Sequence, residues 1–101
     1  MANLFLRKVD HPQAQNNYRV ILKTEFEEIE IGSIGVQTFT SVDSSWTWGI
    51  DTVIPMSENE SEGRGTDRRD CMAKFKAAWQ RLEADRGRML EFLDAKRRAR
   101  R

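Results

Sequence analysis

The sequence contains a single cysteine and a single histidine, and each scarcity excludes a kind of chemistry. Cys71 has no partner for an intramolecular disulfide, which is typical of proteins from a reducing compartment. A Ser-His-Asp or Cys-His arrangement would depend on His11 alone. No Cys/His cluster suits zinc, and no loop matches a calcium hand. We therefore expect a cytoplasmic protein that is not an enzyme and holds neither a metal nor a cofactor.

Long apolar runs and an excess of one charge are also missing. No run approaches the roughly 18 apolar residues of a membrane span, and residues 1–10 lack the basic leader and sustained apolar region of a signal peptide. The 17 basic and 16 acidic side chains nearly cancel, which argues against a surface devoted throughout to nucleic acid. With 39% apolar residues in a chain of 101, we expect one globular domain. We expect no membrane partner, and any nucleic-acid binding should be confined to a local surface of the domain.

The most informative stretch that is present is W-T-W-G-I-D-T-V-I-P, residues 46–55. Large apolar side chains fall on alternate positions of it, at Trp46, Trp48, Ile50 and Ile54. This period is typical of a strand with one buried face. We expect the two tryptophans to mark the centre of a small core, and Pro55 to end the strand.

The chain before this strand predicts two further strands. Residues 18–23 alternate largely between apolar and basic side chains, and residues 28–40 form a second apolar stretch. Residues 24–27 connect the two as a hairpin turn, although they include no glycine, asparagine or proline. Residues 1–17 are expected to supply either an edge strand or an extended arm over the core, and then a polar linker.

The apolar residues of the second strand change sides within it. Ile29 and Ile31 lie on odd positions, whereas Ile34 and Val36 lie on even ones. A strand with a period of two cannot change faces without an extra residue, so we predict a bulge or sharp bend at Gly32-Ser33.

Residues 56–65 are charged, include two glycines and show no periodicity, so we expect a mobile loop. The two glycines of E-G-R-G-T lie directly before a helix N-terminus, where an anion could bind. The alternative is that they only make the loop flexible.

A helix capped by Thr66 or Asp67 follows the loop. Its apolar stripe is spaced by three and four residues and consists of Cys71, Phe75, Ala78 and Leu82, flanked by Met72 and Trp79. Cys71 on this stripe is expected to act as a small buried hydrophobe. The opposite, solvated face is expected to carry Arg68, Arg69, Lys74, Lys76, Gln80, Arg81 and Glu83.

Beyond this helix the apolar period continues across Gly87, through Met89, Leu90 and Leu93. We favour a second short helix at about residues 85–96, and a bent continuation of the first helix is the alternative.

These elements predict an α+β fold, in which a three-stranded antiparallel sheet (β-β-β-α) has one face covered by a helix. The chain divides into an N-terminal arm or edge strand (1–17), a core domain (18–83), a helical extension (84–96) and a disordered basic tail (97–101). The predicted core consists of Val20, Leu22, Ile31, Ile34, Trp48, Ile50, Phe75, Trp79 and Leu82.

One candidate functional surface is the basic C-terminal end. Its seven cations, against two carboxylates, are Arg86, Arg88, Lys96, Arg97, Arg98, Arg100 and Arg101. A flexible arginine-rich end can contact phosphates, so we predict weak nucleic-acid association through these residues. The alternative is that the cations keep the protein soluble or complement a helix C-terminus.

The second candidate surface is the apolar side of the extension, which carries Met89, Leu90, Phe92 and Leu93. One narrow contact cannot cover four large apolar side chains so close together. Either the extension folds back over the domain, or it pairs with another chain as a protein-interaction or homodimerisation module.

Several motifs together resemble a family of short, uncharacterised bacterial proteins. They are W-T-W-G-I in the strand, G-R-G before the helix, M-A-K-F-K-A-A-W within it and the ending E-F-L-D-A-K-R-R. In that family a strand ending in W-x-W-G-I is followed by a variable loop and a helix ending in F-K-A-A-W. The resemblance covers roughly Tyr18 to Arg98. It implies this order of elements, and it implies no activity, cofactor or catalytic residue.

Overall fold

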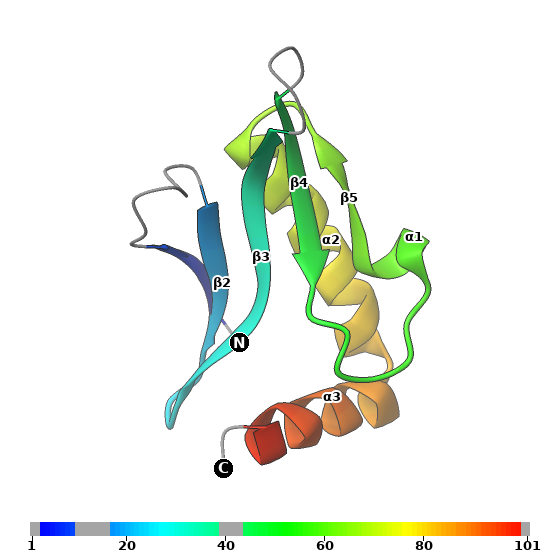
Figure 1. Ribbon diagram of the computed structural model, residues 1–101. Coiled ribbons are helices and arrows are strands. Elements are labelled where there is room, and N and C mark those ends of the chain that lie inside the picture. The colour runs from blue at the N-terminus through cyan, green and yellow to red at the C-terminus, as the bar shows by residue number, and fades with distance from the viewer. Residues whose placement is uncertain (1–2, 10–16, 39–43, 100–101) are drawn as a thin grey trace.

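A computed structural model describes residues 3–9, 17–38 and 44–99. These residues form one antiparallel sheet of five strands in the order β1-β2-β3-β4-β5, together with three helices (Figure 1). The elements are β1 (Asn3–Lys8), β2 (Asn17–Lys23), β3 (Glu28–Thr38), β4 (Ser44–Ile50), α1 (Glu58–Ser61), β5 (Glu62–Gly65), α2 (Arg68–Ala84) and α3 (Arg86–Ala99). The fold is therefore α+β with C-terminal helices. No helix in this part of the chain is long and apolar enough to cross a membrane.

The prediction of a three-stranded sheet is wrong, because an extra strand pairs at each edge. At one edge β1 pairs with β2, and Leu4 and Leu6 pack against the core, so the N-terminal segment is an edge strand. At the other edge the predicted loop contains β5, which pairs with β4. The two glycines of β5 carry no side chains, so the sequence shows no alternation there. A Cβ atom on Gly63 would lie 2.8 Å from Trp48 Nε1, and one on Gly65 would lie 2.7 Å from Cys71 Sγ.

A bulge in β3 is confirmed, and it lies at Ile31, one position before the predicted Gly32-Ser33. Val20 is paired with Gly32 and Ile21 with Glu30, so Ile31 is the extra residue. The bulge allows Ile29, Ile31 and Ile34 all to be buried in one core although their positions differ in parity.

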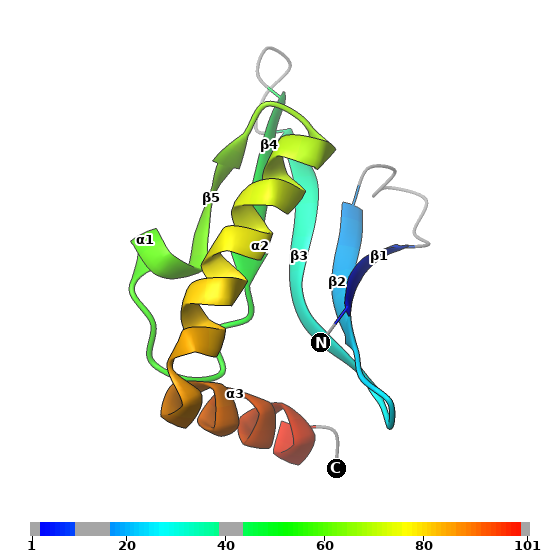
Figure 2. The same ribbon diagram turned by 180° about the vertical axis from the view of Figure 1, so that it is seen from behind.

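Helix α2 lies along one face of the sheet, over β3, β4 and β5 (Figure 2). All nine predicted core residues are buried. Phe75 meets Trp48 edge to face, with ring centroids 6.2 Å apart, and Trp79 meets Phe92 in the same way at 5.4 Å. Burial of each such aromatic side chain contributes on the order of 2 to 3 kcal/mol, so these contacts hold α2 and α3 firmly in place.

Aspartates define the ends of the two long helices. Asp67 is the N-cap of α2 and accepts a hydrogen bond from the Asp70 N–H at 2.7 Å, and the Asp70 carboxylate accepts one from the Thr66 N–H at 2.9 Å. Asp85 separates α2 from α3 and accepts a hydrogen bond from the Arg88 N–H at 3.2 Å. The break therefore lies two residues before Gly87, and the extension is a separate helix.

Helix α3 crosses the lower end of the molecule in Figure 1, at a steep angle to α2. It continues to Ala99, so residues 97–99 are helical and not the disordered tail that the sequence predicted. The last two residues of that predicted tail lie outside the described residues.

Candidate nucleic-acid interface

Most of the predicted basic end is engaged in ion pairs within the chain. The pairs are Arg88 with Glu60, Lys96 with Asp51, Arg97 with Glu27 and Arg98 with Asp94. Three of these four join α3 to α1, to the end of β4 or to the β2–β3 hairpin. Arg86 makes no ion pair with another described residue, and Arg100 and Arg101 lie outside the described residues. The basic end thus fastens α3 to the sheet. Up to Ala99 it is part of a helix held by ion pairs, and it is not a free arm.

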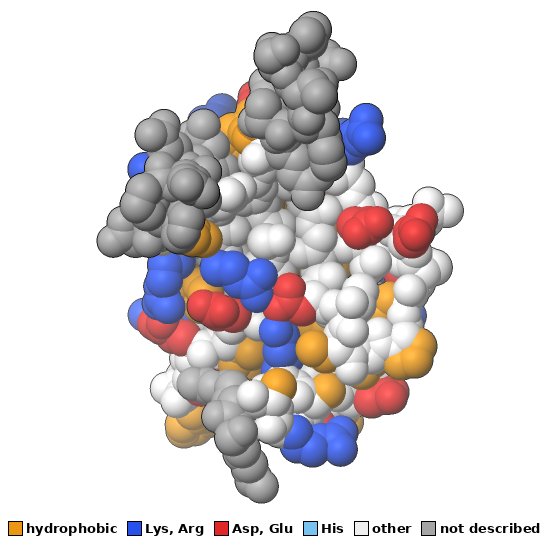
Figure 3. Space-filling model, in the orientation of Figure 1, with side chains coloured by type: hydrophobic (Ala, Val, Ile, Leu, Met, Phe, Trp, Pro, Cys, Tyr) orange, Lys and Arg blue, Asp and Glu red, His pale blue; other side chains and the backbone are white. Residues whose placement is uncertain are grey.

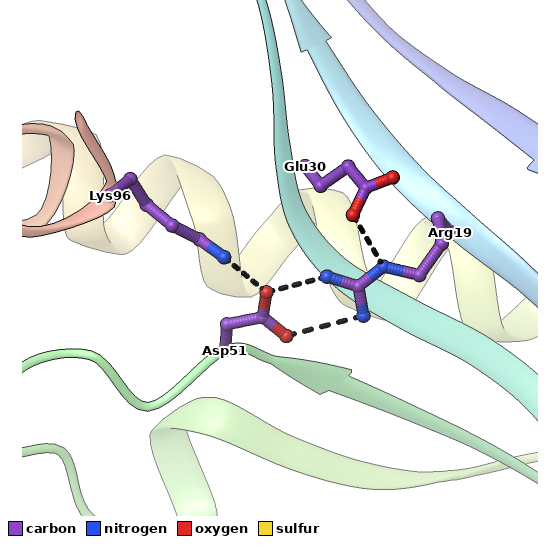
Figure 4. A network of polar contacts seen from close by, with 4 residues as sticks. All are labelled: Arg19, Glu30, Asp51 and Lys96. Atoms are coloured by element: carbon purple, nitrogen blue, oxygen red, sulfur yellow. Dashed lines mark hydrogen bonds and ion pairs between the residues drawn. The ribbon is translucent and has the colours of Figure 1, made fainter. Parts of the chain in front are cut away.

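The least exposed of these contacts is the network around Asp51 (Figure 4). Arg19 Nη2 lies 2.6 Å from Asp51 Oδ2, Lys96 Nζ donates to the same carboxylate, and Arg19 Nε lies 3.5 Å from Glu30 Oε2. Burial alone would raise the pKa of Asp51, but hydrogen bonds from Arg19 and Lys96 outweigh it and hold that pKa below the ordinary value. The Lys96 side chain is only 14% exposed. Lys96 therefore stabilises the fold and is not available to a ligand.

Charges of both signs occupy the sheet face opposite α2, where Figure 3 shows basic and acidic side chains next to one another. Arg7 of β1 pairs with Glu28 of β3 at 2.6 Å on the exposed sheet. Carboxylates on this face would repel phosphate, so the open face of the sheet does not favour a nucleic acid.

The predicted apolar surface of the extension is largely used inside the chain. Phe92 is fully buried, and Met89 and Leu93 are partly buried against the core. Leu90, which is 67% exposed, is the one exposed large apolar side chain among the described residues of α3. The extension thus folds back over the domain, as the first of the two alternatives predicted.

A hollow of about 100 Å³ lies beside the C-terminal half of α2. Its walls are Met56, Glu60, Ala78, Arg81, Leu82 and Arg88. The Arg88 guanidinium donates to the Pro55 carbonyl at 3.0 Å and to the Glu60 carboxylate, and this second bond lowers the pKa of Glu60. Arg88 and Glu60 thus satisfy one another, and Arg81 is the remaining charged side chain of the lining.

The exposed face of α2 carries a second group of cations, which we call the α2 basic face: Arg69, Lys74, Lys76 and Arg81. Arg69, Lys76 and Arg81 form no ion pair with any residue that the structure describes. Lys74 pairs with Asp70 at 3.0 Å, and its Nζ also donates to the Arg64 carbonyl at 3.0 Å. Three charges on this face are therefore available to a ligand.

Sequence analysis places these residues on the solvated face of the helix but does not identify them as a candidate site. The sequence signal that could have identified two of them, Lys76 and Arg69, is the absence of carboxylates three or four positions away along the chain. Residues three and four positions from Lys76 are Met72, Ala73, Trp79 and Gln80, and Arg69 likewise has no acidic side chain at those distances. Cations without such partners cannot be neutralised along their own helix.

The described residues offer neither a group of metal ligands nor a reactive thiol. No three His, Cys, Asp or Glu side chains gather there in a group that could hold a metal ion. Cys71 is buried, and burial raises the pKa of its thiol, so the sulfur is a core atom that favours its neutral form. His11 lies outside the described residues.

Comparison with known proteins adds no further assignment: the chain matches no family model, no curated protein and no solved structure.

Proposed function

We propose that this protein is a small, non-catalytic module that binds nucleic acid weakly through the α2 basic face. The observation that carries the proposal is that Arg69, Lys76 and Arg81 are exposed and make no ion pair with a described residue. Helix α2 has five basic and two acidic side chains, although the chain as a whole carries a net charge of only +1. A local basic surface on a nearly neutral protein suits modest, salt-sensitive attraction to phosphate.

The basic C-terminal end takes a smaller part in this proposal than the sequence predicts. Arg86 begins α3 directly after α2 and can add a contact, whereas Arg98 lies near the far end of α3 and pairs with Asp94. Arg88, Lys96 and Arg97 already have carboxylate partners, and a phosphate would have to displace these to be bound. Displacement would also loosen α3, so those residues are poor ligands for phosphate.

The expected signature is a dependence of affinity on salt. Each phosphate neutralised on duplex DNA contributes about −0.9 to the slope of the logarithm of the association constant against the logarithm of salt concentration. The three available cations of the α2 basic face, each in contact with one phosphate, therefore predict a slope of about −2.7. Affinity that is independent of salt would contradict the proposal.

The test is fluorescence anisotropy with a labelled DNA duplex of about two helical turns. The variant Arg69→Gln/Lys76→Gln/Arg81→Gln keeps residues that favour helix and removes three charges. The matched control Lys8→Gln/Lys23→Gln/Arg64→Gln removes the same charge from exposed positions on the sheet. We expect the α2 variant to lose at least about tenfold in affinity at low salt and the control to lose much less. Equal losses would reject the α2 basic face, and absence of binding by the unmodified protein would reject the function.

The alternative function was a protein-interaction or homodimerisation module that uses the apolar side of the extension. With Phe92 buried against Trp79, that side keeps Leu90 as its exposed large apolar residue among those described. A single exposed leucine is ordinary on a protein surface, so we do not carry this alternative forward.

A further inference from the structure

We propose that α2 binds in the major groove of duplex DNA, with its cations reaching the phosphates on both sides of the groove. This inference rests on the proposed function and names the form of nucleic acid. Three features of α2 support it: the distribution of the cations around the helix, the side chains between them and the way that α2 is mounted on the sheet.

The cations of the α2 basic face form two rows. At 3.6 residues per turn, Arg69 and Lys76 lie on one side of the exposed face, and Lys74 and Arg81 lie on the other. The two members of each row are seven residues apart, which is about 10 Å along the helix axis. The exposed side chains of Ala73, Ala77 and Gln80 lie between the rows, and Lys74 is the one cation of the four that already pairs with a carboxylate.

A narrow ridge with a row of cations on each side complements a groove between two phosphate backbones. The major groove of B-form DNA is about 12 Å wide and admits one α-helix. Alanines at the leading edge keep the ridge narrow, while long Arg and Lys side chains extend sideways toward the phosphates. The major groove of A-form RNA is too narrow and deep for a helix, and a single strand cannot present two opposed rows of phosphates. The arrangement therefore favours duplex DNA.

Helix α2 is accessible and rigidly mounted. Figure 2 shows it as the outermost element on its side of the sheet, with no described element over its outward face. Its inner side is fixed by the buried Phe75 and Trp79. The helix also lies so close to β3 that Gly32 has no room for a Cβ atom beside the Phe75 ring. A rigid helix loses little conformational entropy when it binds.

Acidic side chains limit the extent of the contact. Asp70 is turned to the helix cap, where it accepts from the Thr66 N–H and pairs with Lys74. Glu83 is exposed and lies seven residues beyond Lys76, on the same side of the helix. It would face a phosphate backbone, so the contact is confined to about residues 69–81. We expect Glu83→Gln to tighten binding of duplex DNA, because it removes that repulsion.

Three probes of equal length test the inference: a DNA duplex, an RNA duplex and a DNA single strand. We expect the DNA duplex to bind at least about fivefold more tightly than either of the others at the same salt concentration. The variant Ala77→Tyr adds bulk at the leading edge without changing charge. We expect it to weaken binding to the DNA duplex about tenfold and to leave binding to heparin unchanged, because heparin has no groove.

The outcomes separate this inference from the proposed function. If no polyanion binds, the proposed function itself fails. If the DNA single strand or the RNA duplex binds as tightly as the DNA duplex, or if Ala77→Tyr binds the DNA duplex as the unmodified protein does, the protein binds polyanions without using the groove. The proposed function then stands and the groove inference is overturned. Circular dichroism of Ala77→Tyr establishes that any loss does not come from unfolding.

Discussion

Replacement of Gly32 by alanine should destabilise the protein severely, although a methyl group is small. Gly32 lies on β3 directly under α2, and a Cβ atom there would lie 2.5 and 2.7 Å from two carbons of the Phe75 ring, as well as against the Gly49 carbonyl. The described glycines have no positive φ, so the requirement for glycine is steric and not conformational. Overpacking a well-packed core costs about 1 to 3 kcal/mol. With an aromatic ring and a backbone carbonyl both in the way, we expect about 3 kcal/mol.

Thermal unfolding followed by circular dichroism measures this loss. In a domain of this size each kcal/mol lowers the melting temperature by about 4 °C or more, so Gly32→Ala should melt at least about 12 °C lower. Gly49→Ala is the matched control on the neighbouring strand, because the atom nearest to its Cβ would be Glu62 Cβ at 3.7 Å, an ordinary van der Waals contact. The control should change stability by no more than about 0.5 kcal/mol. Equal melting temperatures for the two variants would refute the close approach of α2 to β3.

Three further predictions follow from the packing and the charges. Phe92→Ala should lower the free energy of unfolding by about 3 to 5 kcal/mol, because Phe92 is fully buried against Trp79. The control Leu90→Ala, on the exposed side of α3, should change it by less than about 0.5 kcal/mol. Urea titrations measure both changes. Asp51→Asn should cost about 2 kcal/mol near neutral pH. The folded-state pKa of Asp51 lies below its ordinary value of 3.8, so the stability from its ionisation is complete above that value and is lost as the pH falls through the folded-state pKa. Urea titrations of both proteins at several pH values should therefore show their difference shrinking in acid, and a constant difference would contradict the network. Glu83→Gln should raise affinity for the DNA duplex in anisotropy titrations, and an unchanged affinity would place Glu83 away from the phosphates.

Apolar periodicity was sufficient to predict most of the core, although Ile21, Ile29 and Phe92 are also buried and were not among the predicted core residues. Alternation in β4 and spacings of three and four in α2 identified Trp48, Phe75 and Trp79 as buried, because each pattern maps directly onto one face of its element. The change of parity in β3 also located its bulge to within one residue. These features depend on neighbours close in the sequence, which is why they are readable from it.

Strand β1 was one of two alternatives for the N-terminal segment, whereas β5 could not be predicted in the same way. Strand β5 is only four residues long, and two of them are glycines that accommodate Trp48 and Cys71, so it leaves no alternating pattern.

The turn of residues 24–27 lacks the usual turn residues. The Thr24 hydroxyl oxygen takes their place by accepting hydrogen bonds from the Phe26 and Glu27 N–H groups at 3.3 and 3.1 Å.

For a related reason, the sequence points to α3, whereas the site that we propose lies on α2. The sequence identifies α3 as the most basic segment, but it does not show that Lys96 meets Asp51 or that Arg97 meets Glu27, 45 and 70 positions away. Only the folded chain shows which cations have partners. The cations of α2 that make no ion pair with a described residue are less concentrated in the sequence and more available in space.

The strand order of the sheet also bears on how the chain folds. Each strand pairs only with strands adjacent to it along the chain, so the sheet can grow one hairpin at a time. The entropy of closing each loop is then small, and relative contact order is low for a protein with so much sheet. We expect folding within about milliseconds, with α3 docking last because its anchor Trp79 becomes positioned only once α2 lies on the sheet.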